Sequence, residues 1–122
     1  MKQFIKDNKI KAHCKSVSRN PNMPDWKDAN HYHVTLSSKG KKMSVFFSMG
    51  LGHKNKPTVA DVLDCLASDA PYADESFEDF LSGFGYTDED RKTYNAIVRT
   101  NDRLRNFLGD SFDALIYETE RL

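Results

Sequence analysis

The stretch HYHVTLSSKGKKMSVFFSMG, residues 31–50, carries the clearest structural pattern in this chain of 122 residues. Apolar side chains recur at every second position: Tyr32, Val34, Leu36, then Met43, Val45, Phe47 and Met49. Such alternation is typical of strands that bury one face. Lys39 and Gly40 supply the turn between the two runs, because Gly tolerates a positive φ. The stretch therefore predicts a β-hairpin, in which Phe46 lies on the face opposite the apolar row.

The residues before the hairpin show a weaker form of the same pattern. Residues 2–18 alternate loosely, which predicts one or two short strands with a turn at residues 6–9. Residues 18–30 contain two prolines and several Asn and Asp, so they predict a loop, which Trp26 would hold against the body of the protein.

After the hairpin, the apolar period changes from two to 3.6, which indicates helices. Thr58 and Asp61 form a capping pattern at the start of the first helix, and a break is expected at residues 68–74. A short helix follows at 77–84, then a long helix that starts near Thr87 and ends at Gly109, then a last helix. We therefore expect an α+β fold in one domain, residues 1–122. Its N-terminal antiparallel β-sheet has the hairpin 31–49 at its centre, and three to four C-terminal helices pack on one face.

The charges divide sharply along the chain although the formal net charge is zero. Residues 1–56 hold twelve Lys or Arg and three Asp or Glu, a net charge of +9, while residues 57–122 hold six and fifteen, a net charge of −9. Residues 57–90 contain ten acidic residues and no Lys or Arg. Such asymmetry favours a charged partner, or self-association into a homodimer. The alternative is that both kinds of charge only keep the surface solvated.

Several function classes find no support in the sequence. The apolar runs are too short for a membrane span, and the N-terminal residues do not resemble a signal peptide, so we expect a protein that stays in the cytoplasm of the cell that makes it, with reduced cysteines. His13, Cys14, His31 and His33 could bind zinc if they met in the sheet, but exposed polar residues explain them as well. Cys14 in a lysine-rich strand could be a nucleophile, whereas Cys65 fits a small buried apolar residue. We expect no enzyme, metal or cofactor.

Four segments resemble a widespread family of small proteins from phages and prophages. They read PTVADVLDCLASD (57–69), SFEDFLSGF (76–84), GYTDEDRK (85–92) and FLG (107–109), and the resemblance extends over residues 31–122. The resemblance implies an origin in a mobile element, and it identifies no active-site residues in this chain. Small phage proteins are often antagonists of host defence, including CRISPR inhibitors, and this analogy sets an expectation only.

Two hypotheses for the function follow from the charges. In the first, an acidic helical face docks on a host defence protein, such as a CRISPR effector or a similar nucleic-acid-binding protein, and blocks its nucleic-acid site. Its residues are Asp61, Asp64, Asp74, Glu75, Glu78 and Asp79. In the second, the basic sheet itself binds nucleic acid, with lysines on the phosphates and aromatic rings, among them Tyr32 and His33, under the bases. Its residues are Lys39, Lys41, Lys42, Phe46, Arg99 and Arg103.

Overall fold

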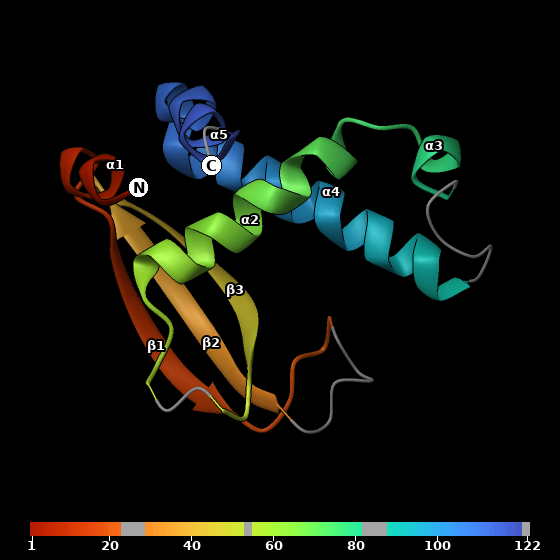
Figure 1. Ribbon diagram of the computed structural model, residues 1–122, viewed down its shortest axis with the longest axis horizontal. Helices are drawn as coiled ribbons and strands as arrows, with labels where there is room; N and C mark the ends of the chain where they lie inside the picture. The colour runs from red at the N-terminus through yellow and green to blue at the C-terminus, as the bar shows by residue number, and fades with distance from the viewer. Residues whose placement is uncertain (23–28, 53–54, 82–87, 121–122) are drawn as a thin grey trace. The chain divides into compact units, whose positions relative to one another are not determined.

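The computed structural model describes residues 1–22, 29–52, 55–81 and 88–120. Its elements are α1 (Lys2–Asp7), β1 (Lys11–Val17), β2 (Ala29–Ser38), β3 (Lys41–Gly50), α2 (Val59–Ala73), α3 (Phe77–Leu81), α4 (Asp88–Leu108), the 3₁₀ turn η1 (Gly109–Ser111) and α5 (Phe112–Glu120). After the short helix α1, the three strands come first and the other helices follow, as Figure 1 shows, so the predicted α+β class with an antiparallel sheet is confirmed. The chain divides into two compact units, Met1–Asp64 and Cys65–Leu122, with the boundary inside α2.

The first unit is built on a three-stranded antiparallel sheet in the order β1-β2-β3. β2 and β3 form the predicted hairpin, and Ser38 pairs with Lys41 across its turn. Lys39 and Gly40 both have positive φ, 51° and 82°, as the two central residues of a tight hairpin turn require. The hairpin is therefore confirmed, and β2 is the central strand of the sheet.

The inner face of the sheet is the apolar core of this unit. Val34 and Leu36 of β2 are fully buried, and Met43 and Val45 of β3 lie at 5% and 8% exposure. Phe46 is 37% exposed, because it lies on the opposite face, as the alternation predicted. The buried apolar residues of the hairpin therefore gather on one face of the sheet, as the alternation of strand side chains requires.

The N-terminal prediction is partly wrong, because residues 2–7 form the helix α1 and only residues 11–17 form a strand. Burial of Phe4 and Ile10 outweighs the weak local alternation. The Ser38 hydroxyl donates a hydrogen bond of 2.6 Å to the carbonyl oxygen of Asn8, which ties the end of α1 to the sheet. Trp26 lies outside the described residues.

α2 begins where the sequence predicts and ends later. The backbone N–H of Thr58 donates to the Asp61 carboxylate at 2.9 Å, and the N–H of Asp61 donates to the Thr58 hydroxyl at 3.2 Å. This reciprocal pair satisfies two of the donors that a helix start leaves open. The break predicted at 68–74 is wrong, because α2 runs through Pro71 to Ala73. Proline removes one backbone donor near the helix end and does not stop the helix there.

The second unit packs an aromatic cluster between α3 and α4. The Phe80 side chain is 2% exposed, and its ring centroid lies 5.3 Å from that of Tyr94 and 6.0 Å from that of Tyr72. The Tyr94 hydroxyl donates to the carbonyl oxygen of Glu75 at 2.6 Å. The Arg91 guanidinium lies 3.7 Å above the centroid of the Phe77 ring. Residues 72–80 are therefore anchored on α4.

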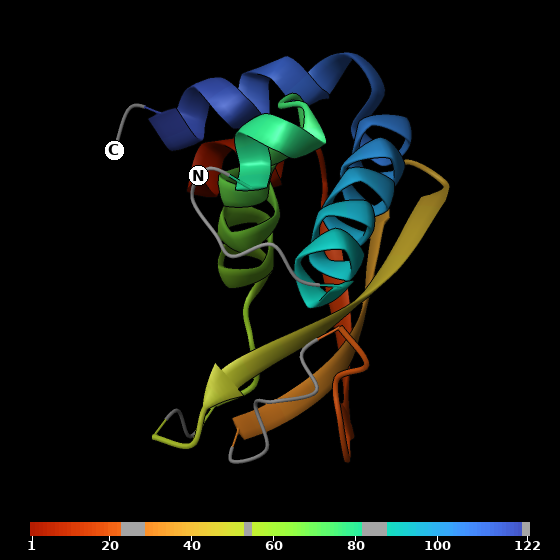
Figure 2. The same ribbon diagram turned by 90° about the vertical axis from the view of Figure 1, so that its right-hand side faces the viewer.

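α4 ends at the glycine that the sequence indicates. Gly109 has a φ of 56° and opens η1, after which α5 leaves at a sharp angle to α4 (Figure 2). Asn101, Leu104 and Leu108 lie on the buried stripe of α4, and Leu104 is fully buried. The start of this helix near Thr87 lies outside the described residues.

Candidate nucleic-acid interface

All three strands contribute side chains to the outer face of the sheet, which lies opposite the apolar core. Directly paired residues of antiparallel strands place their side chains on the same side, so the register defines this surface. We call it the open face, and its twelve residues are Lys11, His13, Lys15 and Val17 of β1; His31, His33, Thr35 and Ser37 of β2; and Lys42, Ser44, Phe46 and Ser48 of β3.

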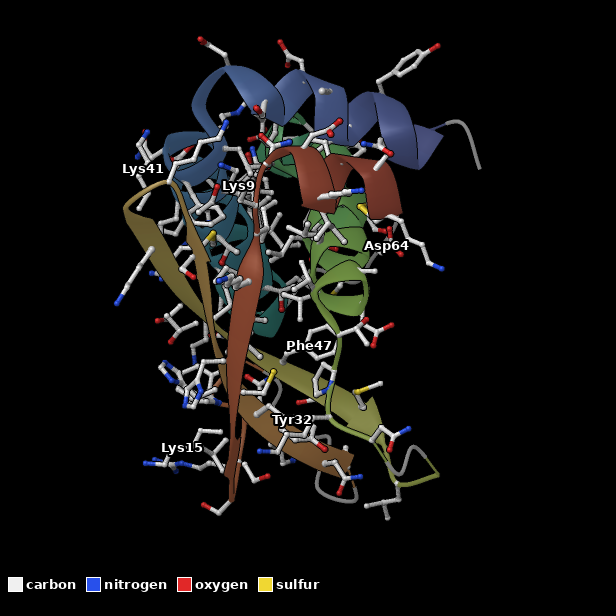
Figure 3. The ribbon with its side chains drawn as sticks, turned by 90° about the vertical axis from the view of Figure 1, so that its left-hand side faces the viewer. Lys9, Lys15, Tyr32, Lys41, Phe47 and Asp64 are labelled. Atoms are coloured by element: carbon white, nitrogen blue, oxygen red, sulfur yellow. The ribbon has the colours of Figure 1, made fainter. Side chains whose placement is uncertain are left out.

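The open face differs from the inner face in exposure and in chemistry. Figure 3 shows Lys15 projecting to one side of the sheet and Tyr32 and Phe47 projecting to the other. Tyr32 is 7% exposed, so its proposed role under a base is wrong. The alternation of β2 puts Tyr32 with Val34 and Leu36 in the core, and it puts His33 on the open face.

The open face carries positive charge without any carboxylate. Lys11, Lys15 and Lys42 are exposed, and the three strands contain no Asp or Glu. Lys11 and Lys42 flank Ser37 in one cross-strand row, and Lys15 begins another row four residues further along β1. The positive potential of this surface is therefore not neutralised from within the sheet.

The row that begins with Lys15 continues through His33 to Phe46. The ring centroids of His33 and Phe46 lie 5.2 Å apart with their planes tilted by 58°. The two rings are close enough for an aromatic contact, so the His33 ring packs beside the exposed Phe46 ring. Lysine, imidazole and phenyl ring thus lie side by side across the three strands.

One end of the open face is closed by a polar cluster. Asn20 and His31 are buried, at 3% and 7% exposure, and both contact the hydroxyl of Ser48. The Asn20 amide donates to Ser48 Oγ at 3.0 Å, and Ser48 Oγ lies 2.7 Å from His31 Nδ1. The backbone N–H of Asn22 donates to Asn20 Oδ1 at 2.9 Å. This cluster fixes the chain that follows β1, and it leaves the Lys15 and Lys11 rows as the accessible part of the face.

The structure regroups the residues predicted for nucleic-acid binding. Lys42 and Phe46 lie on the open face, while Lys39 and Lys41 lie at the hairpin turn, exposed. Arg99 and Arg103 are exposed on α4 in the second unit, so they are not counted in the sheet surface. The register of β1 also brings Lys11 and Lys15 into this surface.

The acidic residues predicted to form one face fall in both units. Asp61 and Asp64 belong to the first unit, where the Asp61 carboxylate accepts the helix-capping hydrogen bond and Asp64 is half-buried. The other four lie in the second unit within the exposed segment 74–79. There, Asp74 forms an ion pair of 3.5 Å with Arg105. The segment 74–79 is therefore the part of the predicted acidic face that forms a local cluster.

Neither cysteine has the lowered pKa that activates a nucleophilic thiol. Burial raises the pKa of the Cys14 thiol, and the opposing effect of Lys56 is smaller. Cys65 lies at an exposed position of α2, which contradicts the prediction of a buried residue. Packing around its sulfur raises the pKa of the Cys65 thiol, and the negative charge of Asp69 raises it further. Burial raises the pKa of the Asp69 carboxyl as well.

The histidines weighed as zinc ligands do not meet a cysteine. His13, His31 and His33 lie on the open face, whereas Cys14 pairs with Val34 on the inner face and its thiol donates to the Pro57 carbonyl oxygen at 3.5 Å. No group of three or more His, Cys, Asp or Glu able to hold a metal ion occurs among the described residues.

Comparison with known proteins assigns neither a family nor a function, because no protein-family model, curated protein or solved structure matches this chain. Within the ranges that the structure describes, no helix combines the length and the apolar character needed to cross a membrane.

Proposed function

We propose that this chain binds nucleic acid through the open face of its sheet. The observation that supports the proposal is the register, which gathers three exposed lysines and an exposed aromatic ring on a surface of twelve residues without a carboxylate. Lysines bind phosphates and release the counterions that surround a nucleic acid. An aromatic ring on a sheet offers a stacking surface to bases.

The distribution of charge matters here more than its total. The formal net charge of the chain is zero, so the molecule as a whole does not attract a polyanion. Attraction must come from local segregation of charge. The strands provide it because they contain lysines and no Asp or Glu. The proposal thus ties binding to three named lysines and not to bulk charge.

We expect the triple variant Lys11→Gln, Lys15→Gln, Lys42→Gln to bind an oligonucleotide roughly 100-fold more weakly, since each lost ion pair at an exposed surface contributes up to about 1 kcal/mol and each 1.4 kcal/mol is about tenfold in affinity. Fluorescence anisotropy with a labelled single-stranded oligonucleotide, repeated at several salt concentrations, measures this. The slope of log affinity against log salt should fall by about 2, because each phosphate contact on a single strand contributes about 0.7.

A matched control replaces three exposed lysines outside the sheet, Lys2, Lys6 and Lys92. Its net charge changes by the same amount as that of the first triple variant. It should nevertheless keep most of the affinity, because the lysines of the open face remain. Equal losses in the two triple variants, or no binding by the wild-type chain at low salt, would remove the proposal.

A second candidate function is antagonism of a host defence protein through the segment 74–79. The observation that favours it is the exposure of Asp74, Glu75, Glu78 and Asp79 within six residues, next to Tyr72, which is 40% exposed. A compact acidic surface with an aromatic side chain can compete for a groove that normally holds nucleic acid, such as that of a CRISPR effector. The resemblance to phage and prophage proteins agrees with this candidate.

For the second candidate, we expect a tagged chain to recover a host protein from lysate after nuclease treatment. The variant with Asp74→Asn, Glu75→Gln, Glu78→Gln and Asp79→Asn should recover at least about tenfold less of the host protein. The reason is that charge attraction of this kind speeds association by about 10-fold to 1,000-fold. The matched control neutralises four exposed acids elsewhere, Asp7, Asp102, Asp110 and Asp113. Recovery that disappears with nuclease would argue against this candidate and for the first.

A further inference from the structure

Phe46 is an unusual residue for its position on β3. It is 37% exposed on a face whose other β3 members are Lys42, Ser44 and Ser48. An aromatic side chain contributes to folding mainly through the area it buries, and the inner face holds the core of this unit. Phe46 therefore leaves part of its ring exposed to solvent, and the His33 ring lies beside it with the centroids 5.2 Å apart.

We propose that the open face is specific for single-stranded nucleic acid, with a base stacked on the Phe46–His33 pair and phosphates on the lysines of both rows. This inference rests on the proposed function and adds the class of nucleic acid and the contact that selects it.

The spacing of the rows suits a single strand of nucleic acid that crosses the sheet. Neighbouring strands lie about 4.8 Å apart, so Lys15 and Phe46, at the two ends of one row, are separated by about 10 Å. Four residues along a strand span about 13 Å, which places Lys11 and Lys42 beyond the stacked base. A few nucleotides can therefore hold a base on Phe46 and their phosphates near lysines on either side.

The middle row begins with His13 of β1 and offers hydroxyl groups on β2 and β3. Thr35 Oγ1 and Ser44 Oγ lie 3.1 Å apart between the aromatic row and the Lys11 row. Hydroxyls both donate and accept hydrogen bonds, so they can meet any base edge or a ribose 2′-hydroxyl. The surface thus has stacking, hydrogen bonding and charge in successive rows.

A duplex does not fit this chemistry. In a duplex, each base is already stacked on its neighbours, so the face of the Phe46 ring has no base to receive. Duplex readout also requires an element that enters a groove, such as a helix or a two-stranded ribbon, whereas the open face is the broad side of a sheet. Lysines alone would hold a duplex weakly and without stacking.

The test is Phe46→Leu, which keeps an apolar side chain and removes the ring. Anisotropy is measured with a 12-nucleotide DNA strand, its RNA counterpart, the matching DNA duplex and inorganic polyphosphate, which has charge but no bases. We expect Phe46→Leu to weaken binding of both single strands about tenfold or more, the effect of losing one stacked base. Polyphosphate binding should be unchanged, and the wild-type chain should bind the duplex at least tenfold more weakly than the strands.

Two controls separate stacking from damage to the fold. Leu51→Ala removes another exposed apolar side chain, at 62% exposure, and should bind like the wild type. Phe46→Trp should keep the affinity. Measured against the Trp26 signal of the wild-type chain, the indole added at position 46 should be quenched by the single-stranded nucleic acids but not by polyphosphate.

The outcomes distinguish this inference from the function on which it rests. Single-strand binding by Phe46→Leu at the wild-type level, or duplex binding as tight as single-strand binding, overturns the inference. In either case the proposed function stands if the triple lysine variant loses affinity. Absence of binding to every probe by the wild-type chain overturns both.

Discussion

Leu36→Ala is expected to lower the free energy of unfolding by about 2–5 kcal/mol, as truncations of buried leucines do. Leu36 is fully buried at the centre of the sheet, between Ala12 of β1 and Met43 of β3. Small domains have a total stability of about 5–15 kcal/mol, so this one change removes a large part of it. Urea denaturation followed by far-ultraviolet circular dichroism measures the loss.

The control for Leu36→Ala is Leu51→Ala, at an exposed leucine, which should stay within about 0.5 kcal/mol of the wild type. A loss below about 1 kcal/mol for Leu36→Ala would mean that the inner face is not the core of this unit. Leu36 lies between Thr35 and Ser37 of the open face, so the same strand carries both surfaces. Under the proposed function, the variant should keep the wild-type affinity for nucleic acid at temperatures where it remains folded, because its open face is unchanged.

The hairpin is the part of the fold that the sequence predicts in detail, because its signals are local. Alternation places Leu36 inside and Phe46 outside without reference to any other part of the chain. The turn needs only that Lys39 and Gly40 adopt positive φ. The capping pair Thr58 and Asp61 spans three residues, and it too is confirmed.

The features that local patterns miss depend on contacts between distant residues. α1 replaces a predicted strand because Phe4 is buried and Asn8 is bonded to Ser38, thirty residues away. Asn20 and Ser48 are twenty-eight residues apart, and no periodicity indicates their hydrogen bond. Such pairings are set by the tertiary fold, which overrides weak local preference.

The candidate interface illustrates the same limit. The sequence indicates that the N-terminal part is basic and that Phe46 points away from the core, but it does not set the register of β1 against β2. A shift of one residue would send Lys11 and Lys15 to the inner face. The ion pair of Asp74 with Arg105, thirty-one residues further on, is likewise invisible to a count of local charge.

In the second unit, Phe80→Ala is expected to cost about 3–5 kcal/mol of unfolding free energy, the range for truncation of buried aromatic residues. Phe80 is 2% exposed and contacts the rings of Tyr72 and Tyr94. Those contacts add about 0.5–1.5 kcal/mol per aromatic pair beyond the buried area. Chemical denaturation followed by tyrosine fluorescence and by circular dichroism measures the change.

Phe80→Leu separates volume from ring contacts, because it keeps most of the apolar bulk and loses the aromatic pairs. It should cost clearly less than Phe80→Ala, while Tyr117→Ala, at a residue 61% exposed, should have almost no effect. A small loss for Phe80→Ala would show that the segment around α3 is not anchored on α4. The four carboxylates of 74–79 would then lack a rigid support, and the second candidate function would lose the fixed acidic surface that it requires.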